Sequence, residues 1–77
     1  MNAKQRKRLD EITTQLDAIK TELEQMSEEE QEKFENMSEG LQQSDNGTKI
    51  EECATHLNEA FTSIETAIGE IEEATSL

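Results

Sequence analysis

The chain lacks proline, tryptophan and tyrosine, and its 77 residues include two phenylalanines, three glycines and one cysteine. A single cysteine excludes an internal disulfide and fits a reducing compartment. No apolar run approaches the ~18 residues of a membrane span, and no apolar segment of the signal-peptide type follows the basic start. We therefore expect one small domain in the cytoplasm, without membrane contact.

Basic residues are also scarce, and they are concentrated at the start of the chain. Asp and Glu number 19 against 7 Lys and Arg, so the formal charge is −12. Residues 4–8 contain four of the basic side chains, and beyond them only Lys20, Lys33 and Lys49 remain. This charge argues against direct binding to a phosphate backbone. A solubilising role, or pairing within the chain, fits the basic run better than a nucleic-acid arm.

Two segments have the seven-residue repeat of a coiled coil, written here as positions a to g. In the first segment, a is Leu9, Leu16 and Leu23, and d is Ile12, Ile19 and Met26. In the second, a is Ile50, Leu57, Ile64 and Ile71, and d is Cys53, Ala60, Ala67 and Ala74. The repeats predict an all-α fold with helices over about 4–36 and 48–75. A loop over about 37–47 would join them into an antiparallel hairpin packed through a and d.

Several details of this hairpin follow as expectations. Thr48 and Glu51 form a capping-box pattern, with Ser44 one turn earlier as the other possible start of the second helix. Asn46-Gly47 is typical of a turn, and Met37 and Leu41 are expected to cover the loop end of the hairpin. Antiparallel packing would bring the basic run beside Glu70, Glu72 and Glu73.

The second helix has more apolar surface than the first helix can cover. Ala54, Phe61 and Ile68 recur at position e, outside the predicted a/d seam. We expect these three residues to mediate self-association into a homodimeric four-helix bundle, with association with another protein as the alternative.

No arrangement of residues indicates catalysis, a metal or a cofactor. Cys53 and His56 are spaced for one helix face, but zinc requires three or four ligands, and Cys53 at position d is expected to be a buried core thiol. Residues 45–52 are similar to part of a calcium loop, but with Gly47 at position 6 the positions 1, 3 and 12 would be Gln42, Ser44 and Cys53, where carboxylates are required. We therefore expect a protein without enzymatic activity and without a cofactor.

An acidic run lies where the first repeat weakens, and it comprises Glu28, Glu29, Glu30, Glu32, Glu35 and Glu39. Such runs are commonly solvated helix faces. The functional interpretation is that rows of carboxylates imitate a phosphate backbone and bind a basic groove of a nucleic-acid-handling protein.

The segment Phe34-Glu35-Asn36-Met37-Ser38-Glu39-Gly40-Leu41-Gln42-Gln43-Ser44 resembles the joining segment F-D-N-M-P-E-N-L-Q-x-S of small acidic proteins encoded by phages and prophages. The layout is similar over nearly the whole chain, but the specific match is confined to residues 34–44. Ser38 replaces the expected Pro and Gly40 replaces the expected Asn. The resemblance implies a helical hairpin and a phage setting, and it brings no established activity. Small secreted hairpins of type VII secretion carry a Trp-x-Gly turn, which this chain lacks.

Two functions remain open from the sequence. The first is a phage-type interaction protein, with the acidic run as an inhibitor's DNA-mimicking surface and a protein of unknown identity as its partner. The second is a structural or assembly coiled-coil protein that binds through its apolar seam.

Overall fold

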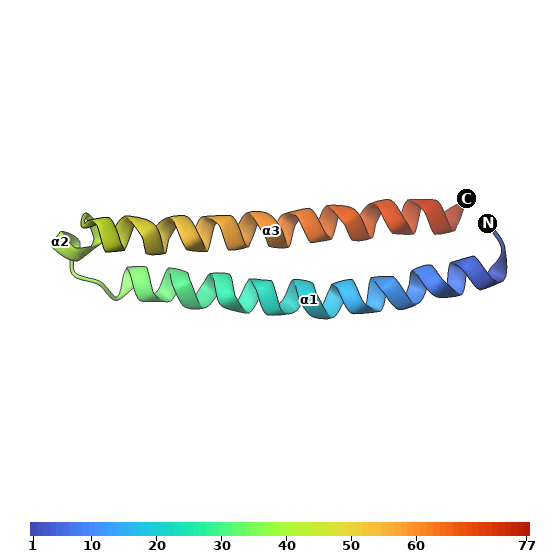
Figure 1. Ribbon diagram of the computed structural model, residues 1–77, viewed down its shortest axis with the longest axis horizontal. Coiled ribbons are helices and arrows are strands. Elements are labelled where there is room, and N and C mark those ends of the chain that lie inside the picture. Colours follow the sequence, from blue (N-terminus) through green and yellow to red (C-terminus); the bar gives the residue numbers. More distant parts are fainter.

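The computed structural model describes residues 1–77 as a rod of 58 × 15 × 13 Å. Helix α1 (Ala3–Glu35) and helix α3 (Asp45–Ser76) lie antiparallel along its length, and the short helix α2 (Glu39–Gln42) turns the chain between them. Both termini therefore lie at the same end of the rod (Figure 1). The prediction of an all-α antiparallel hairpin is confirmed.

Side-chain caps determine where the two long helices begin. The Asn2 side chain accepts a hydrogen bond from the Gln5 amide (2.8 Å), and Gln5 Oε1 accepts one from the Asn2 amide (3.2 Å). These two bonds satisfy amides that a helix start would otherwise leave unpaired. Ser44 caps α3 in the same way by accepting from the Gly47 amide at 3.2 Å. Helix α3 thus starts one turn before Thr48, and the predicted turn at Asn46-Gly47 is wrong.

The connection between the long helices is compact and hydrogen-bonded. Ser38 caps α2, and the Gln42 side-chain amide donates to the Phe34 carbonyl at 2.9 Å, which ties α2 to the end of α1. Met37 is half-buried, but Leu41 is 55% exposed. The expectation that Leu41 covers the loop end of the hairpin is therefore wrong.

The seam between the helices uses positions a and e rather than a and d. On α1 the partly buried side chains are Leu9, Thr13, Leu16, Lys20, Leu23, Ser27, Glu30 and Phe34. On α3 the a and e positions are buried or partly buried: Gly47, Ile50, Ala54, Leu57, Phe61, Ile64, Ile68 and Ile71. An a/e seam buries the large e residues of α3, whereas an a/d seam would have buried cysteine and alanine in their place. The apolar gain therefore favours a and e.

Two contacts define the register of the helices. Ser27 Oγ donates to the Ala54 carbonyl at 3.0 Å, and Lys20 Nζ lies 6.0 Å from the centroid of the Phe61 ring. Both contacts join e positions and are seven residues apart on each helix, so they belong to one continuous register. A further seven residues along, the bulky Phe34 is level with the buried Gly47.

Gly47 lies where no other side chain fits. A Cβ at this position would stand 2.6 Å from the Gln42 carbonyl oxygen and closer still to that of Leu41. Gly69 lies in the same helix, and a Cβ there would meet nothing within 4 Å. The two glycines therefore form a matched pair for substitution.

We expect Gly47→Ala to lower the melting temperature although alanine is the better helix former, because the backbone at the tip must shift by an amount that costs about 1–3 kcal/mol. Gly69→Ala is expected to raise the stability by up to ~1 kcal/mol, which is about 4–8 °C for a domain of this size. Thermal denaturation followed by circular dichroism measures both. Equal stabilisation by the two substitutions would contradict the packing at the tip.

Candidate interaction surfaces

The two broad faces of the rod carry different heptad positions. In an antiparallel pair the positions run in opposite senses around the two helices, so the same letter lies on the same face of both. A groove on one face shows this directly, since Ser27, Glu28 and Gln31 of α1 line it together with Ala54, Thr55 and Asn58 of α3. These are positions e, f and b on each helix. Position d of both helices therefore lies on the other face.

The face formed by position d, called here the apolar face, carries exposed hydrophobic side chains. Ile12, Ile19 and Met26 are 41%, 45% and 50% exposed. On α3 the same face carries the small residues Cys53, Ala60, Ala67 and Ala74, of which Cys53 is fully on the surface. One helix thus supplies large side chains and the other small ones.

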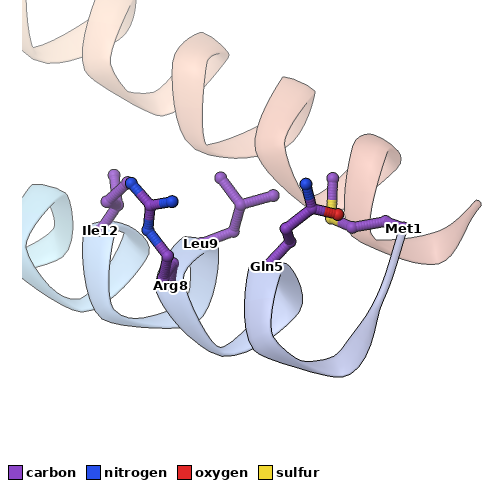
Figure 2. Close-up of a pocket in the computed structure, with 5 residues that line it drawn as sticks. All are labelled: Met1, Gln5, Arg8, Leu9 and Ile12. Carbon is purple, nitrogen blue, oxygen red and sulfur yellow. The ribbon is translucent and has the colours of Figure 1, made fainter.

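At the terminal end, the apolar face is hollowed. A shallow groove of about 250 Å³ is lined by Met1, Gln5, Arg8, Leu9 and Ile12. Figure 2 shows Gln5, Arg8, Leu9 and Ile12 rising from the first turns of α1, with Met1 on the segment that precedes the helix. The cationic side chain of Arg8 therefore lies next to the apolar side chains of Met1, Leu9 and Ile12 in this groove.

The residues expected to mediate self-association belong to the seam instead. Ala54 and Ile68 are 3% and 8% exposed within the single chain, and Phe61 is half-buried beneath Lys20. The expectation that these residues lack a partner within the hairpin is wrong, because the a/e seam gives them one. The unpartnered apolar residues are Ile12, Ile19 and Met26, which the sequence pattern had placed in the seam.

The remaining circumference, positions b, c and f, forms a second region, called here the acidic surface. Its members on α1 are Asp10, Glu11, Asp17, Glu24, Glu28, Glu32 and Glu35. Its members on α3 are Asp45, Glu51, Glu52, Glu59, Glu65, Glu72 and Glu73. All of these residues are exposed, and beyond Arg8 no lysine or arginine occupies a b, c or f position. The acidic surface is continuous along both helices.

The predicted acidic run does not form one patch. Glu28, Glu32 and Glu35 belong to the acidic surface, whereas Glu29 lies at position g beside the apolar face and Glu39 lies in the first turn of α2. Glu30 occupies an a position in the seam and accepts a hydrogen bond from Lys33 Nζ at 2.8 Å. This hydrogen bond and the charge of Glu30 raise the pKa of Lys33 above its usual value.

The other ionic contacts are local as well. The ion pairs of the chain are Lys20–Asp17 (3.8 Å), Lys33–Glu30 and His56–Glu59 (3.5 Å), each three residues apart on one helix. None of them joins the basic run to Glu70, Glu72 or Glu73. The predicted ionic contact across the terminal end of the rod is therefore not formed.

Cys53 and His56 do not form a site. The Cys53 thiol is exposed, so its expected role as a buried core residue is wrong. His56 pairs with Glu59, and nowhere do three His, Cys, Asp or Glu side chains converge as metal ligands.

Comparison with known proteins adds no further assignment, since no family model, curated protein or solved structure matches the chain. Neither long helix contains a stretch long and apolar enough to cross a lipid bilayer.

Glu30 interrupts the apolar seam between Leu23 and Met37, so its replacement should strengthen the seam. We expect Glu30→Leu to raise the free energy of unfolding by about 1 kcal/mol, because an aliphatic side chain at position a buries more apolar area. Glu28→Leu is the matched control at an outward position, where little is gained. Urea unfolding measures both. Destabilisation by Glu30→Leu would indicate that the Lys33–Glu30 pair contributes more to the hairpin than packing does.

Proposed function

We propose that this chain is a non-enzymatic interaction protein of the phage or prophage type, whose acidic surface occupies a basic, nucleic-acid-binding surface of a protein partner. The observation that carries the proposal is the segregation of charge around the rod. Acidic residues occupy most of the b and c positions of both helices, the f positions of α1 add Glu28 and Glu35, and no lysine or arginine occupies a b, c or f position beyond Arg8. If the acidic side chains served solubility alone, they would not need to be separated from the few lysine and arginine side chains.

The shape of the rod suits this role. The carboxylates stand on two parallel helices, so their spacing is held by backbone geometry rather than by flexible loops. A dense field of one sign on a narrow rod steers a basic partner toward it and speeds association, with a strong dependence on ionic strength. The rows of carboxylates on the acidic surface would thereby imitate the phosphates of a nucleic-acid backbone.

The phage setting rests on the resemblance of residues 34–44 to the joining segment of small acidic phage and prophage proteins. In the structure this segment contains the end of α1, the Ser38 cap and α2. The same segment displays Glu39 and the exposed Leu41 at the tip of the rod, away from both termini.

The alternative function is that of a structural or assembly protein that binds its partner through apolar contacts. The observation favouring it is the exposure of Ile12, Ile19 and Met26 along one face. The two functions differ in their response to salt. Binding through apolar contacts is maintained or strengthened at high ionic strength, whereas binding through charges is weakened.

The proposed function is tested by capture of proteins from a bacterial host lysate on the immobilised rod. We expect Glu28→Lys, Glu32→Lys and Glu35→Lys, combined in one variant, to lose the basic nucleic-acid-binding proteins that the native chain retains. The matched control combines Glu28→Asp, Glu32→Asp and Glu35→Asp, which preserves every charge and should retain them. A wash at about 1 M salt, where the screening length is ~3 Å, should release them, as quantified by mass spectrometry.

Equal capture by the lysine and aspartate variants would contradict an acidic binding surface. Capture that survives high salt but is lost in Ile19→Ser would support the assembly function instead.

A further inference from the structure

We propose that the apolar face is covered by a second copy of this chain, related by a twofold axis parallel to the rod. In this dimer α1 of each chain packs antiparallel on α3 of the other, which gives a four-helix bundle with both pairs of termini at one end. The inference is independent of the proposed function, because the interface uses positions d and g while the acidic surface remains free.

The hairpin alone has little core to hold it. Its buried hydrophobic residues are Ala54 and Ile68, and its other apolar side chains are only half-covered or exposed. A chain of this size normally needs additional burial to be stable. One face of a rod 58 Å long and 15 Å wide spans roughly 900 Å², which is close to the ~800 Å² that each partner buries in a standard interface.

The shapes of the two stripes on the apolar face are self-complementary. A twofold rotation about an axis parallel to the rod places the small position-d residues of α3 over the large position-d residues of the other chain's α1. It causes no shift along the rod. In the register set by the Ser27–Ala54 contact, Ile12 then faces the partner's Ala67, and Ile19 faces the partner's Ala60. Met26 faces the partner's Cys53. Each of these three layers therefore pairs a bulky side chain with a small one, as close packing requires.

The charges bordering the apolar face show the same complementarity. At position g, Arg8 comes within about one helical turn of the partner's Glu70, and Glu29 comes within about one helical turn of the partner's Lys49. Glu22 likewise faces the partner's His56. Arg8, Glu70, Glu29 and Lys49 form no ion pair within their own chain. Flanking pairs of this kind add little energy each, but they select partner and orientation.

The opposite arrangement, with a twofold axis across the rod, fits less well. It would stack α1 on α1 and α3 on α3. Ile12, Ile19 and Met26 would then meet the same large residues of the partner, while the alanine stripes would face each other across a gap. Both consequences cost packing energy, through crowding on one side and voids on the other.

The first test is sedimentation equilibrium at micromolar concentration. The native chain should sediment at twice the chain mass of 8.7 kDa. Ile19→Asp should raise the dissociation constant about 100-fold or more, because it buries an unpaired carboxylate. Ala18→Asp, at the neighbouring outward position, is the matched control and should stay dimeric. A monomeric native chain, or equal loss in both variants, would overturn the proposal.

A charge exchange tests the same interface without removing apolar area. Glu29→Lys and Lys49→Glu should each weaken the dimer by about 10-fold, since each places like charges together. The double variant should recover the native affinity. Additive weakening in the double variant would overturn the predicted pairing.

The orientation is tested with spin labels at one end of the rod. Ser76→Cys, combined with Cys53→Ala, provides one labelling site in each chain near the C-terminus. The proposed axis holds the two labels at the same end, about two helix diameters (~20 Å) apart. A separation approaching the 58 Å length of the rod would overturn the parallel axis and indicate the opposite arrangement.

Discussion

The a/e seam between α1 and α3 is the constraint on which the other features of the rod depend. It pairs Lys20 with the Phe61 ring and Ser27 with the Ala54 carbonyl. A cation and a hydroxyl can therefore lie in the seam, because each has a favourable contact there. The lysine stem packs on the ring while its ammonium remains near water. Once this seam is chosen, position d lies toward one face, with the alanines at position d of α3 partly buried at its edge, and position b lies toward the other face.

The separation of an apolar face from an acidic surface follows directly from that choice. An a/d seam would have covered Ile12, Ile19 and Met26 and left only residues of α3 to bind a partner. With the a/e seam, both helices contribute to the apolar face, large side chains from one and small from the other. Most of the acidic residues thereby lie on the outer surface, where they are available for a different partner.

The sequence predicted the fold, but it misassigned one of the two seam positions. Position a is common to both patterns, so the two helices followed from it, and the similar lengths of the two predicted segments favoured the antiparallel order. Position e on α1 reads Thr13, Lys20, Ser27 and Phe34, a mostly polar series that conceals its role. The role of position e could have been recognised from size complementarity between the helices. The large Phe34 lies level with Gly47, and the small Ser27 lies level with Ala54. Caps at Ser38 and Ser44 likewise outweighed the turn propensity of Asn46-Gly47.

The most direct test of the seam uses the two phenylalanines of the chain, whose aromatic protons are easily resolved by NMR spectroscopy. We expect nuclear Overhauser contacts from the Phe61 ring to the side-chain methylenes of Lys20, with upfield ring-current shifts of those methylenes. It also predicts that these contacts persist in Ile19→Asp, where only the hairpin itself remains. In that variant, the absence of any contact from the Phe61 ring to Lys20 would contradict the a/e seam.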